Sequence, residues 1–191
     1  MKRTSVFILC LLATMLSFAQ SKINIIPEPV SIKELKEKAF VLKPTTKIAV
    51  NTSSDAIQTV EFLKEKMETA FGKKITITDL SKLTDNTNSI AFVKVADKVL
   101  GKEGYNLKVR ENNIVIEANE NAGFFYAIQT LIQLIDPLFI EKNECVAPEW
   151  LEIPACEIVD YPRFAYRGKH LDVARHFMQF EDVKRYIDYM A

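Results

Sequence analysis

Apolar residues between positions 55 and 72 recur every three or four positions, the period of an amphipathic helix. This pattern predicts a helix from Asp55 to Phe71, with Ser53 or Ser54 as its N-cap and Gly72 as its stop signal. One face of this helix is expected to pack against a core. Its apolar stripe comprises Ile57, Val60, Leu63, Met67 and Phe71.

Short alternating or continuous apolar segments on either side of this helix predict strands. Ser89 to Val95 is nearly all apolar, as expected for a central strand that is buried on both faces. Glu111–Asn113 separates two alternating segments and predicts a hairpin turn, because asparagine tolerates a positive φ. The predicted strands are 47–51, 74–78, 89–95, 105–110 and 114–118.

A second helix is predicted from Asn121 to Ile135. Its few polar residues, chiefly Gln129, Thr130 and Gln133, form one narrow stripe. A helix that is apolar almost all round is buried on more than one side, so we expect it between the sheet and a neighbouring domain. Together these elements predict an α+β sandwich of about 130 residues with helices packed on a sheet.

Proline-rich segments lie on both sides of this domain. The run from Ile26 to Val30 predicts an extended entry, because proline disfavours helix at itself and just before itself. After the second helix, a connection leads to a predicted strand at Tyr166–Val173, a loop at 174–177 and a further helix. We therefore assign residues 20–160 to the small domain with its linker, and 161–191 to the start of another domain. The prolines of the connection are Pro137, Pro148, Pro154 and Pro162.

The first nineteen residues are typical of a signal peptide. Lys2 and Arg3 precede an apolar stretch from Val6 to Leu16, and Ser17–Ala19 offers small residues before an expected cleavage at Gln20. The stretch is shorter than the roughly 20 residues of a transmembrane helix. The protein is expected to be exported to the periplasm, the cell surface or the medium.

Composition limits the classes of partner. Removing Lys2 and Arg3 from 25 basic and 25 acidic residues leaves a slight negative balance, and no basic block is present. A dedicated nucleic-acid binder is therefore not expected, and no membrane span is predicted in the mature chain.

Two cysteines remain after the leader, Cys145 and Cys156. An oxidising compartment permits a disulfide between them, which would stabilise the fold by roughly 2–3 kcal/mol. The alternative is two free, partly buried thiols. No third cysteine or nearby histidine supports a metal site.

A series of local motifs resembles family 20 glycoside hydrolases, the β-N-acetylhexosaminidases, over nearly the whole mature chain. The resemblance implies their small non-catalytic α+β domain, followed from about Phe164 by the first strand and helix of a (β/α)8 barrel. The motifs are IIPEPV at 25–30, GYNLKV at 104–109, AGFFYAIQTLIQLI at 122–135, IPACEIVDYPRF at 153–164 and YRGKHLDVARHF at 166–177.

The resemblance also implies one substrate-binding side chain. Barrel enzymes carry their sites at the C-terminal ends of the strands, where Arg175 follows the predicted strand. The matching arginine of the family hydrogen-bonds hydroxyls of the terminal amino sugar. Asp172 is a candidate for orienting Arg175, and His176 for reaching the pocket; for both, a structural role is the alternative. Arg167, at the other end of the strand, is interpreted as structural.

The family hydrolyses terminal β-linked N-acetylglucosamine or N-acetylgalactosamine in oligosaccharides or glycoconjugates, without a cofactor. In its retaining, substrate-assisted mechanism an Asp–Glu pair from a later strand acts on the substrate's acetamido group and leaving oxygen. That pair is absent from these 191 residues, so they are expected to be inactive alone and unable to close a barrel. The segment after Pro162 is expected to be mobile or prone to aggregate.

Two other classes remain open. The chain is alternatively a stand-alone binding or scaffolding module, or the beginning of another glycosidase. The sequence leaves its oligomeric state open.

Overall fold

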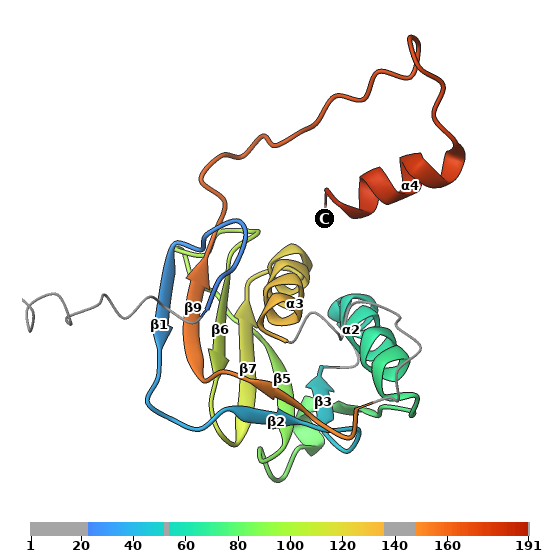
Figure 1. Ribbon diagram of the computed structural model, residues 1–191. Helices are drawn as coiled ribbons and strands as arrows, with labels where there is room; N and C mark the ends of the chain where they lie inside the picture. Colours follow the sequence, from blue (N-terminus) through green and yellow to red (C-terminus); the bar gives the residue numbers. More distant parts are fainter. Residues whose placement is uncertain (1–22, 52–53, 136–147, 191) are drawn as a thin grey trace, which may run out of the picture.

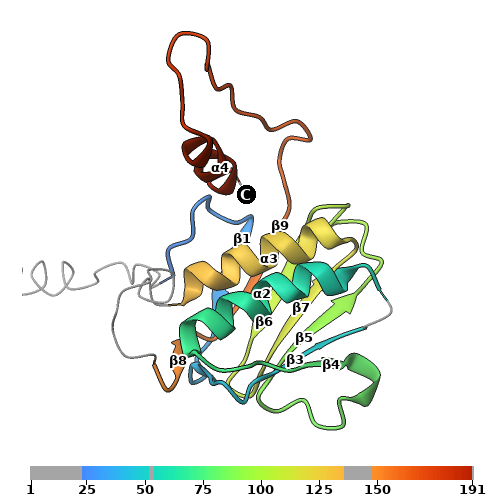
Figure 2. The ribbon, with the colours of Figure 1, turned by 90° about the vertical axis from the view of Figure 1, so that its right-hand side faces the viewer.

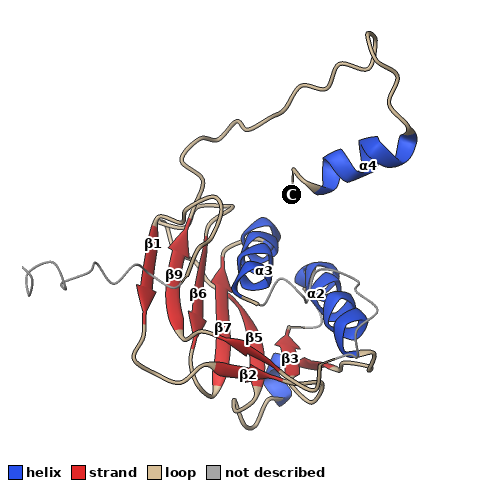
Figure 3. Ribbon diagram, in the orientation of Figure 1, coloured by secondary structure: helices blue, strands red, loops and turns tan. Residues whose placement is uncertain are grey.

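The computed structural model describes residues 23–51, 54–135 and 148–190. Within them, a twisted sheet carries two helices on one face, and an extended segment leads away from the sheet to a further helix (Figure 1). Figure 3 separates these layers by colour. The predicted signal peptide and Cys145 lie outside the described residues.

The sheet has seven strands in the order β1-β9-β6-β7-β5-β3-β4, and β2 pairs with β8 in a separate two-stranded ribbon. The order of strands along the chain differs from this order across the sheet, so much of the sheet forms by contacts between distant segments. The elements are β1 (Ser31–Glu34), β2 (Phe40–Leu42), β3 (Lys47–Val50), α2 (Ala56–Phe71), β4 (Ile77–Asp79), a 3-10 turn (Leu80–Lys82), β5 (Ser89–Lys94), β6 (Tyr105–Val109), β7 (Asn113–Ala118), α3 (Asn121–Leu134), β8 (Leu151–Ile153), β9 (Cys156–Asp160) and α4 (Phe180–Asp188).

One half of the sheet is parallel and the other antiparallel. Strands β4, β3, β5 and β7 run parallel, and α2 is the crossover between the adjacent strands β3 and β4. Strands β7, β6, β9 and β1 are antiparallel, and β6–β7 is the predicted hairpin. Strand β5 is central, and its first four residues are buried, as predicted. Among the described non-glycine residues, positive φ occurs at Asn88 and not in the hairpin turn, so the turn closes without it.

Helix α2 confirms the predicted periodicity. Its buried side chains lie three or four residues apart, and Gly72 ends it with a left-handed φ of 61°. Its N-cap is Asp55 rather than the predicted Ser53 or Ser54. The Ser54 hydroxyl instead donates to the carbonyl of Asn51 at 2.6 Å, so it supports the preceding turn. The buried residues are Ala56, Val60, Leu63, Met67 and Phe71.

Helix α3 lies beside α2 on the same face of the sheet (Figure 2). Its Phe124, Ile128 and Leu131 are almost fully buried, and each contributes about 1.5–3 kcal/mol by leaving water. Thr130 does not belong to the exposed polar stripe that the sequence predicts. It points into the domain, where its hydroxyl lies 2.5 Å from that of Tyr105 on β6. A buried hydroxyl needs such a partner, which explains why Thr130 turns inward.

The connection interpreted as a linker contributes two strands. Strand β9 lies between β1 and β6, and β8 pairs with β2. Pro154 and Pro162 stand outside β9, where they interrupt no hydrogen bond of the sheet. Cys156 on β9 is a buried free thiol in the part of the chain that the structure describes, and because Cys145 lies outside that part the disulfide stays a prediction. Burial raises the pKa of this thiol to about 12, and the nearby Glu34 and Glu157 carboxylates add to the shift.

Candidate substrate-binding site

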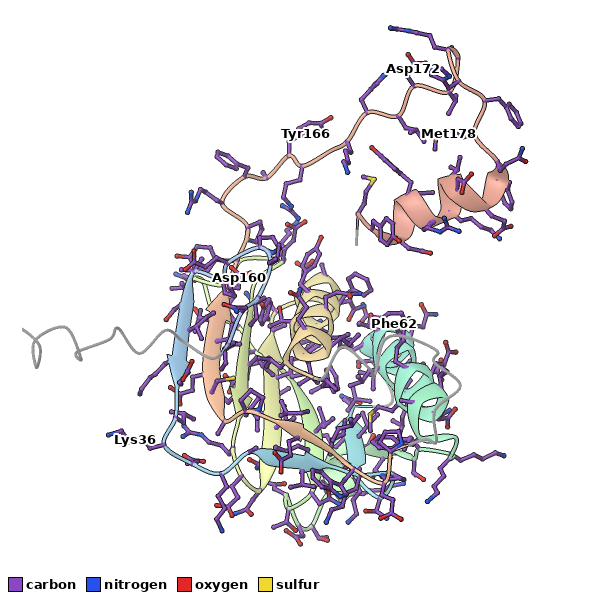
Figure 4. The ribbon with its side chains drawn as sticks, viewed as in Figure 1. Lys36, Phe62, Asp160, Tyr166, Asp172 and Met178 are labelled. Atoms are coloured by element: carbon purple, nitrogen blue, oxygen red, sulfur yellow. The ribbon has the colours of Figure 1, made fainter. Side chains whose placement is uncertain are left out.

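The segment that carries the candidate site begins at the end of β9. There the Asp160 carboxylate accepts a hydrogen bond from the backbone N–H of Val30 at 3.2 Å, which ties the start of β1 to the end of β9. Burial raises the pKa of Asp160, although backbone hydrogen bonds from Val30 and Tyr161 oppose the shift. From this anchor the chain runs away from the sheet through Tyr166 and Asp172 (Figure 4).

The strand predicted at Tyr166–Val173 is not formed, and this prediction was wrong for the structure described. The segment is irregular, and most of its side chains are open to solvent: Tyr166 is 90% exposed, and Phe177 just after it is 86% exposed. A strand requires a neighbour for its backbone N–H and C=O groups. Within the described residues, none of the nine strands pairs with this segment. The loop and the helix predicted after it are present, the helix as α4.

Asp172, the candidate for orienting Arg175, lies in contact with it. One carboxylate oxygen of Asp172 accepts hydrogen bonds from the backbone N–H groups of Ala174 at 2.9 Å and Arg175 at 3.2 Å. The other oxygen pairs with Nε of Arg175 at 2.8 Å. Asp172 therefore holds both the backbone and the side chain of Arg175. The pairing uses Nε, so the two terminal amino groups of the guanidinium are left to donate to a ligand.

The Arg175 side chain is 87% exposed and extends from the loop into solvent. The neighbouring His176 is also exposed. His170 contributes its backbone carbonyl, which accepts a weak hydrogen bond from the Tyr186 hydroxyl at 3.4 Å. The structure thus joins Asp172 to Arg175, whereas the His176 side chain lies open to solvent beside them.

The acids of α4 have local electrostatic roles. Glu181 and Asp182 lie in its first turn, where negative charge interacts favourably with the positive end of the helix dipole. Glu181 pairs with Lys184 at 3.1 Å, and Asp182 with Arg185 at 3.5 Å. These carboxylates are structural partners within one helix, so they do not replace a catalytic pair.

Arg167 has partners that the sequence does not reveal. Its guanidinium donates to the Glu103 carboxylate at 2.8 Å, the Tyr126 hydroxyl at 3.2 Å and the backbone carbonyl of Phe164 at 2.8 Å. The hydrogen bonds to Glu103 and Tyr126 raise the pKa of Arg167, so it stays charged. Glu103 and Tyr126 belong to the small domain. The structural interpretation of Arg167 therefore gains a specific role, which is to join two parts of the chain.

Other chemistry is limited in the part of the chain that the structure describes. No group of three His, Cys, Asp or Glu side chains there is placed to hold a metal ion. None of the described helices combines the length and the hydropathy that a bilayer-spanning helix needs.

The two parts of the chain match two consecutive domains of one enzyme family. Residues 22–161 match glycosyl hydrolase family 20, domain 2, and residues 164–191 match the catalytic domain of the same family. The chain belongs to glycosyl hydrolase family 20. The break between the two matches falls directly after β9, where the fold changes from the sheet to the extended segment.

Relatives and solved structures of family 20 agree with this assignment. A β-hexosaminidase of Porphyromonas gingivalis is 33% identical over 88% of this chain. The N-acetyl-β-hexosaminidase of Streptomyces plicatus superposes with a TM-score of 0.73 at 31% identity, over 86% of this chain and 31% of its own. A chitobiase of Flavobacterium johnsoniae gives 0.62 at 27% identity, over 87% of this chain and 25% of its own. The chain spans only 21% of the Porphyromonas relative.

Proposed function

We propose that this chain is the N-terminal portion of an exported β-N-acetylhexosaminidase. The observation that carries the proposal is the pair of adjacent family 20 matches, small domain first and catalytic domain second. The proposed substrates are oligosaccharides or glycoconjugates that end in β-linked N-acetylglucosamine or N-acetylgalactosamine. A mutant of the Streptomyces plicatus β-hexosaminidase has been solved in complex with product (GlcNAc), which supports this substrate class.

Arg175 is the proposed substrate-binding residue. Its guanidinium fork suits two adjacent sugar hydroxyls, since it offers several N–H donors in a fixed plane. Asp172 is proposed as the positioning residue, because its carboxylate fixes the loop and holds Nε of Arg175 at 2.8 Å. With Nε engaged, the terminal amino groups have fewer orientations to lose when the sugar binds.

The proposed reaction is retaining and substrate-assisted, so the acetamido oxygen of the sugar attacks its own anomeric carbon. An Asp–Glu pair from a later part of the enzyme would steady the acetamido group and protonate the leaving oxygen. These 191 residues supply binding and positioning only. We therefore expect them to be inactive by themselves.

The test uses the protein encoded by the complete reading frame and a chromogenic N-acetyl-β-glucosaminide. Arg175→Ala should lower kcat/KM by about a hundredfold, as expected for a lost charged hydrogen-bonding partner. Arg163→Ala, at an exposed arginine outside the loop, is the matched control and should leave kcat/KM unchanged. Asp172→Asn keeps one acceptor oxygen and should have an intermediate effect. Full turnover by Arg175→Ala would refute the assignment of the site.

Activity and export are tested separately. No turnover by the complete protein on either amino-sugar substrate would refute the hexosaminidase proposal. For export, we propose cleavage before Gln20. N-terminal sequencing of the mature protein checks this, and a mature chain that still begins at Met1 would contradict it.

A further inference from the structure

A cavity of about 480 Å³ lies between the turn of the β6–β7 hairpin and the β2–β8 ribbon. Its volume falls in the range of small-molecule sites in proteins, about 300–1,000 Å³. The hairpin turn follows Val109, which pairs with Cys156, whereas the segment that matches the catalytic domain follows Asp160, at the other end of β9 (Figure 1). We call this cavity the hairpin pocket. It is lined by Lys38, Ala39, Val41, Glu111, Asn112 and Glu152.

Two ion pairs join the walls of the hairpin pocket. The Arg110 guanidinium pairs with the Glu37 carboxylate at 2.7 Å, and the Lys38 ammonium lies 3.5 Å from the Glu111 carboxylate. Arg110 also pairs with Glu157 on β9. Pairs this open to water add little stability one by one. Together they connect the segment before β2 to the hairpin turn, so the pocket exists before a ligand arrives.

The β2–β8 ribbon supplies the apolar side of the pocket. Its Phe40, Leu42 and Ile153 side chains turn into the core, where each is 1% exposed or less. Val41 and Glu152 pair directly across the ribbon. Because side chains alternate along a strand, both point away from the core and into the pocket. This position of the ribbon therefore offers an apolar group and a carboxylate side by side.

Glu152 and Asn112 supply polar atoms that are not in use. Within residues 23–51, 54–135 and 148–190, no hydrogen bond or ion pair engages either side chain, and both are exposed. An ionised carboxylate only accepts hydrogen bonds, whereas an amide both donates and accepts. The Lys38 ammonium adds further donors. The pocket thus combines acceptors, donors and an apolar surface.

Charge and shape select the class of ligand. Two carboxylates against one ammonium repel phosphate and other anions. Neither an aromatic ring nor a group of three metal-binding side chains lines the pocket in the described part of the chain, so a flat aromatic ligand or a metal ion matches it poorly. A pyranose ring matches it well, because its hydroxyl groups donate and accept while its C–H groups present an apolar surface.

We propose that the hairpin pocket is a carbohydrate-binding site of the small domain. Glu152 and Asn112 hydrogen-bond the hydroxyl groups of one pyranose unit, and Val41 contacts its C–H groups. The inference goes beyond the proposed function and uses it only to choose the sugar. A small domain that holds a glycan raises the concentration of that glycan around the enzyme to which the domain is linked.

Titration of the mature chain with the trisaccharide of β-1,4-linked N-acetylglucosamine tests the pocket, with binding followed by NMR through the backbone amide shifts. Glu152→Ala and Asn112→Ala should each weaken binding at least about fivefold, as expected for a lost hydrogen-bonding partner. Glu149→Ala is the matched control, because it removes an exposed carboxylate just before β8 and outside the pocket. It should leave the dissociation constant unchanged. All three positions are exposed, so folding should tolerate the substitutions.

Two further titrations define what the pocket recognises. The trisaccharide of β-1,4-linked glucose lacks the acetamido group, so equal binding would support a site for ring hydroxyls, and weaker binding a site that also contacts the acetamido group. Inorganic phosphate should not bind. Tighter binding of phosphate than of either sugar would overturn the inference. Absence of saturable sugar binding, or binding that Glu152→Ala and Asn112→Ala leave unchanged, would also overturn it.

Turnover by the complete wild-type protein separates this inference from the proposed function. An active enzyme whose small domain binds neither trisaccharide overturns the carbohydrate-binding site alone. An inactive complete protein, with sugar binding that the two pocket variants weaken, overturns the hexosaminidase proposal alone.

Discussion

Gly123 lies in the first turn of α3, and replacing it tests how closely this helix packs against the sheet. A Cβ atom added there would lie 2.3 Å from the backbone oxygen of Gly104 and 2.8 Å from Cβ of Ala118. The oxygen belongs to the main chain just before β6 and cannot rotate away. Gly123→Ala therefore forces α3 to move by about 1 Å, since non-bonded atoms prefer separations near 3.5 Å.

Two opposing terms determine the expected change in stability. Alanine favours a helix over glycine by about 1 kcal/mol. Forcing an extra carbon into a packed interface costs about 1–3 kcal/mol, and a rigid backbone neighbour places this site near the upper value. We expect Gly123→Ala to lower the free energy of unfolding by about 2 kcal/mol. The melting temperature of a domain of this size should then fall by about 8 °C.

Urea unfolding followed by far-UV circular dichroism measures this change. Ala122→Gly is the control, because it makes the reverse change at the adjacent, half-buried position. It should cost no more than about 1 kcal/mol, which is the propensity term alone. If Gly123→Ala were as stable as the wild type or more stable, the close approach of α3 to Gly104 would not require glycine, and the reasoning would fail.

Three further outcomes follow from the buried Thr130–Tyr105 pair, the half-buried Asp160 and the buried Cys156. Thr130→Val leaves the Tyr105 hydroxyl buried without its partner and should lower the free energy of unfolding, measured in urea, by about 1–3 kcal/mol. Adding Tyr105→Phe should recover most of that free energy. A double variant less stable than Thr130→Val would contradict this. Burial raises the pKa of Asp160, so its proton is held more tightly in the folded state and its contribution to stability decreases as the pH rises above the ordinary value of 3.8. Asp160→Asn should flatten that slope, and an unchanged slope in urea unfolding between about pH 4 and pH 7 would refute the assignment. Burial raises the pKa of Cys156 to about 12. In a variant whose other two cysteines are replaced by serine, Cys156 should resist iodoacetamide in the folded protein and react in urea. Rapid labelling of the folded protein would count against its burial.

Local pattern was sufficient for the elements whose stability is decided within a few residues. The 3.6-residue period of α2 and the alternation of the β6–β7 hairpin follow from which side chains must face the core. The continuous apolar run of β5 likewise predicted its central place. Asp172 and Arg175 also lie in contact, because three residues of separation let an aspartate bond its own turn, and the binding role of the pair stays a prediction.

Pairing between segments that are distant in the chain could not be predicted from the local pattern of apolar and polar residues. Strand β9 pairs with β1 on one side and β6 on the other, although the residues of β9 alone do not indicate which strands it pairs with. The partners of Arg167 lie 64 and 41 residues away in the chain. Thr130 was predicted on a polar stripe, and only the position of the Tyr105 hydroxyl explains why it turns inward.

The sequence by itself determined the helices, the hairpin and the series of motifs that identified the family. The tertiary structure decided the order of the strands, the inward hydroxyl pair and the contact of Arg167 with the small domain. It also corrected the strand predicted at Tyr166–Val173, which has an apolar pattern but no paired neighbour in the described residues. The physical reason is the same in each case. A helix satisfies its backbone hydrogen bonds within itself, whereas a strand, a buried hydroxyl or an ion pair needs a partner that only the fold brings near.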